Sequence, residues 1–343
     1  RNGDLDDLCL DYLRKWMMFG WSYREQFRHK PCAIIPDDHD VYHGNVWGES
    51  GKKADTSDGH GMLAQDSGGY KMPAEWVNMV QFTQTSHLPD PYDPTPVQQN
   101  IGVYYTSWNY AGLSFAILED RKFKSAPKHI LPPEAQVRNG WIQNKEFDIK
   151  QHRNLDAVLL GKRQHDFIDH WTQDWNNGAA MKVVLSQTNF ATVATLPKPA
   201  LNDDVVPSLP IPKKGEYVLG DVPTVDMDSN GWPANERDKA VKAIRKCFAF
   251  HIAGDQHLGS FIQYGVDQHA DSGYAFAGPA LNNIWPRRFW PEVQSGEHTY
   301  ENPSYVGDHE DGFGNKISVH AVGNPFDTGI EPAIVHNRAT GYG

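Results

Sequence analysis

Two short segments of this chain combine the side chains that bind metal ions and transfer protons. They are DDHD at 37–40 and GDQH at 254–257, each with at least one carboxylate and an imidazole within four positions. Carboxylate oxygens suit hard cations, and imidazole suits iron or zinc. Either tetrapeptide alone is more often a solvated turn, but each follows a short apolar run, 32–35 in one case and 247–253 in the other. The pair therefore predicts one metal site built from two distant segments.

Short strands are expected to position these groups. Apolar runs predict strands that each end in a polar cluster, at 32–35, 113–118, 182–185 and 247–253. The two middle runs end in Glu119-Asp120-Arg121 and in SQTN at 186–189. In an open α/β sheet, ligands bind beyond the carboxyl ends of the strands. The four clusters should therefore meet at one edge of the sheet.

Amphipathic stretches between the strands predict helices that cover the sheet. They lie at 5–29, 73–84, 162–175 and 233–246. Three other regions lack such periodicity: a Gly- and Asp-rich loop at 44–70, expected to be mobile, a Pro-rich connection at 197–224, and a Gly- and Asn-rich stretch with β-like pieces after Trp290. The alternation of helix and strand indicates a single α/β domain over 1–343.

Composition excludes several classes of protein. The 343 residues are 39% hydrophobic, enough for a large core, and the 32 Lys and Arg against 43 Asp and Glu give a charge of −11. No basic stripe stands out, which argues against a nucleic-acid partner. No run reaches the roughly 18–20 apolar residues of a transmembrane segment. Three scattered cysteines predict neither a disulfide framework nor a zinc cage.

Several motifs together resemble one family. IPDDHDVYHGN at 35–45 is similar to the DDHE-type loop of the PhoD-like alkaline phosphatases, a branch of the metallophosphoesterases, and AGDQHLG at 253–259 to their GDxH loop. FAILEDRKF at 115–123 and Trp-Pro-x-x-x-Arg at 232–237 follow the expected order. The resemblance covers 8–291 and leaves 292–343 as a C-terminal extension. It implies an α/β metallophosphoesterase fold, a β-sandwich flanked by helices.

The resemblance also implies roles for individual residues. His39 matches the catalytic histidine that stabilises or protonates the departing ester oxygen, and Asp38, Asp255 and His257 match metal-facing residues. Weaker candidates are Asp37 and Asn45 for support of the metal site and Arg121 for a phosphate oxygen. The family holds a dinuclear metal centre, commonly iron and calcium, that activates water to attack small-molecule phosphate esters. Its members are often periplasmic or secreted, although no signal segment is visible in this chain.

One departure from the family pattern concerns the N-terminus. The family takes its first metal ligands from segments before the DDHE loop, whereas the 36 residues before Asp37 indicate a single helix. Asp4, Asp6 and Asp7 suit the start of that helix, where carboxylates favour its dipole. The resemblance thus implies an N-terminally truncated domain. Two alternatives stay open: a non-catalytic relative that binds phosphate esters or a partner, and a metal-dependent hydrolase of another ester class.

Other polar clusters have simpler interpretations. A polar helix face explains His165, Asp166, Asp169 and His170. The DMDSNG segment at 226–231 begins like an EF-hand loop, but Arg237 replaces the glutamate at position twelve. We expect an exposed acidic turn at 308–311, surface ion pairs for Arg287 and Arg288, ordinary turn residues at Asn282 and Asn283, and a buried apolar environment for Cys32.

Overall fold

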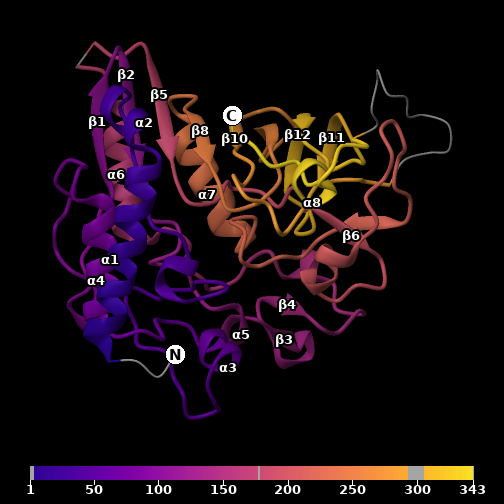
Figure 1. Cartoon of the computed structure of the whole chain (residues 1–343), viewed down its shortest axis with the longest axis horizontal. Helices are drawn as coiled ribbons and strands as arrows, with labels where there is room; N and C mark the ends of the chain where they lie inside the picture. Colours follow the sequence, from indigo (N-terminus) through magenta and orange to yellow (C-terminus); the bar gives the residue numbers. More distant parts are fainter. Residues whose placement is uncertain (1–3, 177, 293–304, 343) are drawn as a thin grey trace.

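The computed structural model describes residues 4–176, 178–292 and 305–342. Within them, helices and strands alternate along much of the chain (Figure 1). The helices are α1 (Leu5–Ser22), α2 (Arg24–His29), α3 (Met62–Asp66), α4 (Ala74–Thr85), α5 (Pro127–Ile130), α6 (Gly161–Gln173), α7 (Ala234–Arg245) and α8 (Ala333–His336). The strands are β1 (Thr106–Tyr110), β2 (Leu113–Ile117), β3 (Val137–Arg138), β4 (Trp141–Ile142), β5 (Met181–Leu185), β6 (Thr195–Pro197), β7 (Asp221–Pro223), β8 (Phe250–Ala253), β9 (Ser260–Tyr264), β10 (Tyr274–Ala277), β11 (Gly307–Glu310) and β12 (Lys316–Val322).

One sheet of eight strands forms the centre of the described structure, in the order β1-β2-β5-β8-β10-β9-β12-β11. Strands β2, β5, β8 and β10 are parallel, while β1 pairs antiparallel with β2 and β9 antiparallel with β10. Three of the predicted strands are therefore adjacent and point the same way, so their carboxyl ends share one edge. The α/β class is confirmed. Because the described strands form this sheet and two small pairs, the finer expectation of a β-sandwich is not confirmed.

The fourth predicted strand is absent. Residues 32–35 run as an irregular segment, and Cys32 is exposed, contrary to the buried environment expected for it. Pro31 and Pro36 flank the segment, and a proline has no N–H to offer a neighbouring strand. The DDHD loop therefore reaches the edge of the sheet without being carried there by a strand.

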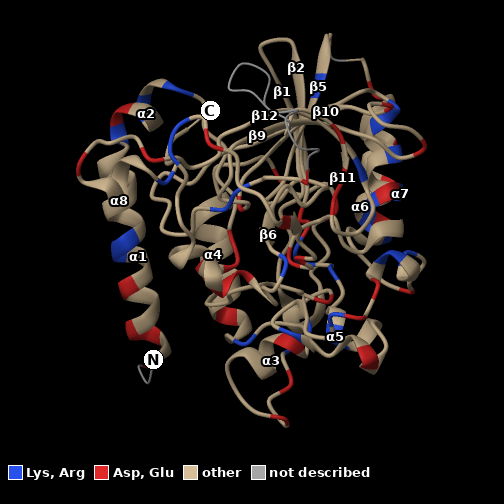
Figure 2. Ribbon diagram, turned by 90° about the vertical axis from the view of Figure 1, so that its right-hand side faces the viewer, with Lys and Arg blue, Asp and Glu red and all other residues tan. Residues whose placement is uncertain are grey.

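Helices α6 and α7 pack on one face of the sheet. Phe167 and Ile168 from α6 and Ile244 from α7 are fully buried in a cluster that also contains Val184 of β5 and Ile262 of β9. Of the residues expected on a polar face of α6, Asp166, Asp169 and His170 are exposed, and Asp166 and Asp169 form ion pairs with Lys162 and Lys246. His165 differs from this expectation, because it is buried with its Nε2 3.7 Å from Glu236 of α7. Figure 2 shows α6 and α7 on the side of the molecule opposite α1 and α4.

The predicted N-terminal helix is divided at Tyr23 into α1 and α2. No residue of α1 is fully buried. Its Tyr12 ring packs edge-on against Trp76 of α4, with ring centroids 5.6 Å apart, and Leu5 and Leu8 are half-buried against the same apolar cluster. Since this cluster includes the buried Val41, it connects the N-terminal helices to the DDHD loop.

The two regions predicted to be loops contain more regular structure than expected. The 44–70 loop contains α3 and buried residues such as Trp47, and the 197–224 connection contributes to the β6–β7 pair. Within the predicted extension at 292–343, strands β11 and β12 join the central sheet through β9, while residues 293–304 lie outside the described residues. Among the described helices, none is long and apolar enough to cross a membrane.

The acidic turn expected at 308–311 is also wrong. Its first three residues belong to strand β11, and Asp311 is fully buried. The Asp311 carboxylate accepts hydrogen bonds from the backbone N–H groups of Thr192, Phe313 and Asn315 at 2.9–3.1 Å. Asp311 thus links the C-terminal part of the sheet to the segment that follows β5. The three donors are needed because burying a carboxylate without hydrogen bonds is unfavourable.

Candidate metal centre

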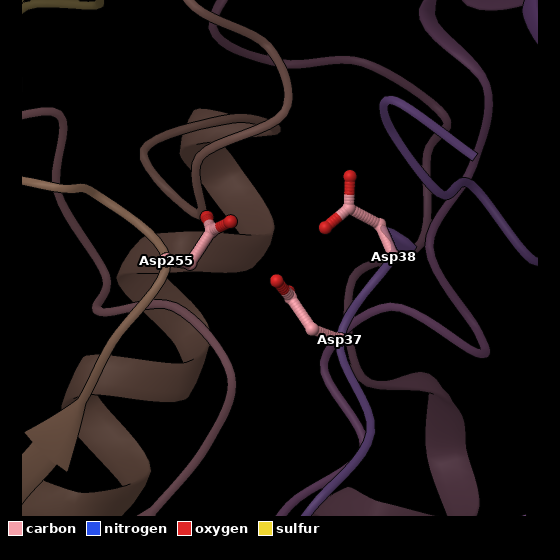
Figure 3. Close-up of side chains that lie close together, drawn as sticks. All are labelled: Asp37, Asp38 and Asp255. Atoms are coloured by element: carbon pink, nitrogen blue, oxygen red, sulfur yellow. The ribbon is translucent and has the colours of Figure 1, made fainter. Parts of the chain in front are cut away.

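Three carboxylates from the two predicted loops meet at the carboxyl edge of the sheet. Asp37, Asp38 and Asp255 each offer an oxygen, and these oxygens all lie within 4.8 Å of one another. In Figure 3, Asp255 faces Asp37 and Asp38 across a narrow gap, coming from the opposite side of it. More than 210 positions of sequence separate the two loops, so only the fold brings these groups together.

The sheet holds Asp255 in a tightly defined position. The residue lies two positions after the end of β8, and the intervening Gly254 donates its N–H to the Gln187 carbonyl at 2.9 Å. Asp255 and His257 have φ values of 63° and 57°, a left-handed conformation that is uncommon for residues other than glycine. Non-glycine residues in such conformations persist where the surroundings fix them, and they concentrate at functional sites.

The DDHD loop is held by short-range hydrogen bonds and by α4. Asp40 accepts the Asp37 N–H at 2.9 Å, and the Asp40 carbonyl accepts the indole N–H of Trp76 at 3.3 Å. Residues His39–Val41 form a single 3-10 turn, which Tyr42 ends in a left-handed conformation. Tyr42 then stacks on Trp76, with ring centroids 4.9 Å apart. Packing against α4 therefore helps to set the position of Asp37 and Asp38.

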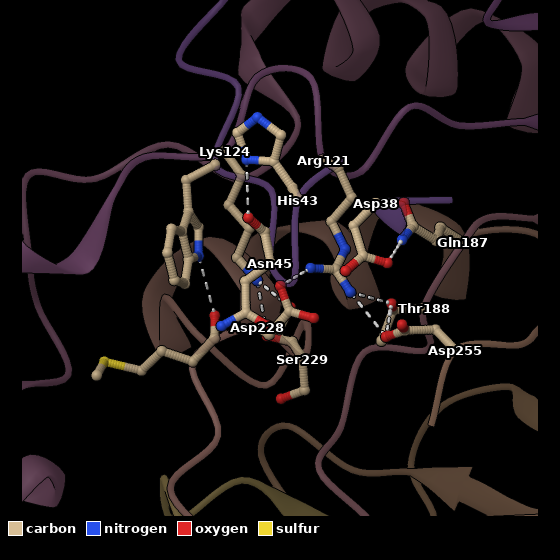
Figure 4. A network of polar contacts seen from close by, with 12 residues as sticks. Asp38, His43, Asn45, Arg121, Lys124, Gln187, Thr188, Asp228, Ser229 and Asp255 are labelled. Carbon is tan, nitrogen blue, oxygen red and sulfur yellow. Dashed lines mark hydrogen bonds and ion pairs between the residues drawn. The ribbon is translucent and has the colours of Figure 1, made fainter. Parts of the chain in front are cut away.

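Arg121 lies next to the carboxylates and is buried (Figure 4). Its guanidinium donates to Asp228 through Nη1 and, through Nη2, to Asp255 at 2.7 Å and to the Thr188 hydroxyl at 2.8 Å. The Thr188 hydroxyl donates to Asp255 at 2.6 Å. Each terminal nitrogen of Arg121 therefore forms an ion pair within the protein, and the arginine holds Asp255 in place.

Gln187 connects the two acidic loops. Its side-chain N–H₂ donates to Asp37 and, at 3.4 Å, to Asp38. Its backbone N–H and that of Thr188 donate to the buried Asp120 carboxylate at 3.1 and 2.8 Å. No role was predicted from the sequence for Gln187, Thr188 or Asp120. All three nevertheless follow predicted strands of the sheet, and this position in the sequence is the signal that could have identified them.

The charges of the three carboxylates oppose one another. Burial and the nearby Asp255 charge raise the pKa of Asp37 to about 6, and burial together with Asp37 and Asp228 raises the pKa of Asp38 well above its usual range. Burial would also raise the pKa of Asp255, but Arg121 and the Thr188 hydrogen bond outweigh it and lower that pKa. A cation between the three groups would relieve this repulsion and favour their charged forms.

A small cavity adjoins the carboxylates. It has a volume of about 40 Å³ and is lined by Asp37, Asp38, Arg121 and Gln187 on its polar side, with Val41 among its apolar residues. A site for one water needs roughly 10–15 Å³ by this measure. The cavity therefore has room for a small ion or a few water molecules, and the three carboxylates are donors of the kind that hard divalent cations take.

The remaining predicted site residues surround the triad without joining it. The His39 side chain is 78% exposed, with Nε2 4.0 Å from an Asp38 carboxylate oxygen. His257 is half-buried, and its Nδ1 lies 3.4 Å from the Asn283 side-chain oxygen. The Asn45 amide donates to the Asn139 carbonyl at 2.9 Å. His39 thus lies at the rim of the site, while the hydrogen bonds of Asn45 support a neighbouring loop.

Acidic residues for which no metal-binding role was predicted form ion pairs with arginines at and near the site. Asp228, in the rejected EF-hand match, pairs with Arg121. Asp226 pairs with Arg287 at 2.8 Å, and Arg287 also pairs with Asp203 at 2.9 Å. Arg288 pairs with Asp221. The ion pairs of both arginines are largely buried, so the surface location expected for them is wrong. Asn283, expected in an ordinary turn, is buried and donates to the His257 carbonyl at 3.0 Å.

Comparison with known proteins leaves the family open. No family model matches the chain, and no curated protein matches it. A solved structure of PhoD superposes on it with a TM-score of 0.40 and 15% sequence identity, over 73% of this chain and 39% of that one. The chain thus spans about two fifths of the length of that structure. A likeness of this size assigns neither family nor function.

Proposed function

We propose that this chain acts as a metal-dependent phosphoester hydrolase of the PhoD-like type that its two acidic loops resemble. The observation that carries the proposal is the meeting of Asp37, Asp38 and Asp255 within 4.8 Å, from loops far apart in sequence. The three carboxylates would hold one hard divalent cation. The resemblance implies a second metal ion, for which His257 is the candidate ligand, and iron and calcium as the pair.

The donor set fits such a cation. The three carboxylates carry more negative charge than Arg121 offsets. Their burial and mutual repulsion raise the pKa values of Asp37 and Asp38. A bound divalent cation acidifies water and offsets negative charge on a phosphoryl group. Phosphoryl transfer depends chiefly on such positioning and charge stabilisation.

The residues of the chain would share the remaining work. His39, exposed at the rim beside Asp38, would give a proton to the departing ester oxygen, which contributes roughly 10²–10⁴-fold in rate. Arg121 already forms ion pairs with Asp228 and Asp255 through its two terminal nitrogens. We therefore propose that Arg121 positions Asp255, and that the phosphate is held mainly by the cation.

The test combines metal content with a substrate panel. The purified chain is loaded with Mn²⁺ or Ca²⁺, its metal is measured by mass spectrometry, and turnover is compared for p-nitrophenyl phosphate, bis(p-nitrophenyl) phosphate and p-nitrophenyl acetate. We expect stoichiometric metal and hydrolysis of the phosphate esters alone. Asp38→Asn should lose both metal and turnover, whereas Asp58→Asn, at an exposed position in another loop, should lose neither.

Each contrary outcome has a distinct meaning. Metal binding without turnover of any ester would contradict the hydrolase, whereas absence of both would favour the non-catalytic relative with an incomplete metal centre. Turnover of the acetate in preference to the phosphates would favour a hydrolase of another ester class. Absence of both metal and turnover would contradict the proposal.

A further inference from the structure

We propose that an aromatic cavity between α1 and the DDHD loop receives a planar aromatic group of the substrate, so that the preferred substrates are aryl-bearing phosphate esters. The phosphate part of this inference rests on the proposed function; the aromatic part rests on the cavity. The cavity has a volume of about 440 Å³. It is separate from the small cavity beside the three carboxylates, and the DDHD loop contributes residues to both.

Aromatic rings form much of the lining. Tyr12, Trp16 and Phe19 come from α1, and Tyr42 comes from the end of the DDHD loop; Ile34 adds an aliphatic surface. Trp16 and Phe19 have ring centroids 5.4 Å apart and planes inclined by 32°. Aromatic faces of this kind favour another flat ring, in stacked or edge-on contact, over an aliphatic group of similar size.

The fold leaves these rings accessible. Phe19 and Tyr42 are 38% and 36% exposed. Tyr42 has a φ of 58°, an uncommon conformation for a bulky residue, and its stacking on Trp76 fixes the ring in this place. A well-packed surface rarely leaves several aromatic rings in one hollow without a binding role.

Apart from His39, the polar side chains that line the cavity interact with other groups of the protein. Gln84 donates to the Tyr12 hydroxyl at 2.7 Å, and Asp40 accepts the Asp37 N–H. Lys15 pairs with Asp11 at 2.6 Å. The contacts that remain for a ligand are therefore mainly apolar and aromatic. A polar sugar or peptide would find few hydrogen-bond partners in this cavity.

His39 connects the cavity to the proposed reaction site. It lines the cavity, and its Nε2 lies 4.0 Å from the Asp38 carboxylate. A phosphate at the three carboxylates would therefore have His39 between it and the aromatic rings. An ester whose alcohol carries an aryl group would place its bridging oxygen near His39 and its ring in the cavity.

The experiment measures binding separately from chemistry. Dissociation constants of 1-naphthylphosphonate, hexylphosphonate and methylphosphonate are determined by calorimetry on the metal-loaded chain. We expect naphthylphosphonate to bind at least about tenfold more tightly than either alkyl compound. Trp16→Ala and Tyr42→Gly should each reduce this preference several-fold; glycine suits the positive φ at position 42. Trp21→Ala, on the same helix but 70% exposed and outside the lining, should keep it.

Three results would be decisive. Equal affinity for the naphthyl and hexyl compounds, or no binding of the naphthyl compound, overturns the inference. A naphthyl preference that survives in folded Trp16→Ala and Tyr42→Gly variants also overturns it, because the ring then binds elsewhere. The third result is a chain that hydrolyses no phosphate ester but shows a naphthyl preference that the two variants abolish. This result would support the aromatic binding site and contradict the hydrolase, so the two proposals can fail separately.

Discussion

The two halves of the candidate centre are held in different ways. Asp255 follows a central strand, is paired with Arg121 and Thr188, and keeps a lowered pKa. Asp37 and Asp38 follow an irregular segment, accept hydrogen bonds from the neutral Gln187 side chain, and have raised pKa values. One half is thus a charged ligand fixed before any cation binds. The other is a pair of repelling carboxylates that a cation would stabilise.

This difference separates structural from functional roles within a single site. The charge of Asp255 would stabilise both the fold and a bound ion. It stabilises the fold because the buried Arg121 needs an ion-pair partner. The charges of Asp38 and Asp37 would serve the ion alone. Substitutions in the two halves should therefore affect metal binding in the same direction and stability in opposite directions.

The largest effect is expected at Asp255. Asp255→Asn should abolish metal binding and turnover, and should lower the free energy of unfolding by about 3 kcal/mol, the usual cost of removing one partner from a buried ion pair. Urea denaturation of the metal-free chain measures the stability, and metal content is read in parallel. Stability equal to that of the unaltered chain would mean that Asp228 alone satisfies Arg121, and that the two halves do not differ as described.

Asp38→Asn should also remove the metal, with an opposite effect on stability. The pKa of Asp38 is raised by burial and neighbouring carboxylates, so its charge is unfavourable in the folded state at neutral pH. Removing that charge should leave the metal-free chain at least as stable as before. The same denaturation measurement checks this, and a loss of stability as large as that of Asp255→Asn would erase the distinction between the halves.

A smaller, purely kinetic effect is expected at His39. His39→Ala should lower kcat at least about 10²-fold for an ester with a poor leaving group, and much less for p-nitrophenyl phosphate, whose leaving group needs no proton. Metal content should be nearly unchanged, and stability should change by less than about 0.5 kcal/mol because the side chain is 78% exposed. Full activity of the variant with the poor leaving group would rule out the assigned role.

The smallest effect at neutral pH concerns one buried histidine in each half. Burial lowers the pKa of His251 in β8 and of His43 after the DDHD loop to about 3, from 6.5. Each folded pKa lies below the unfolded value, so the stabilisation is complete above about pH 6.5 and is lost as pH falls towards 3.

Unfolding free energies of the metal-free chain between pH 7 and 5 test this prediction. His251→Gln and His43→Gln should each show a weaker loss of stability on acidification than the unaltered chain. A slope unchanged by His251→Gln would mean that this imidazole is not held neutral in the fold.

The sequence predicted the strand-borne part of the site well. Strands β2, β5 and β8 and the helices α4, α6 and α7 follow from local apolar periodicity and from prolines that start two of the helices, and the motif GDQH after β8 pointed to Asp255. The prediction failed at residues 32–35, where an apolar run suggested a strand. Whether a short apolar segment pairs with a sheet depends on partners elsewhere in the chain, which local pattern does not contain.

The sequence by itself therefore determined the residue types, the α/β alternation and the two acidic loops. Only the tertiary structure decided that Asp37, Asp38 and Asp255 share one site, that Arg121 is bound to Asp228 and Asp255, and that α1 covers the DDHD loop with aromatic rings. The physical reason is that helix and strand preferences act over a few residues. Ion pairs, burial and carboxylate repulsion act between groups that come together only once the whole chain has folded.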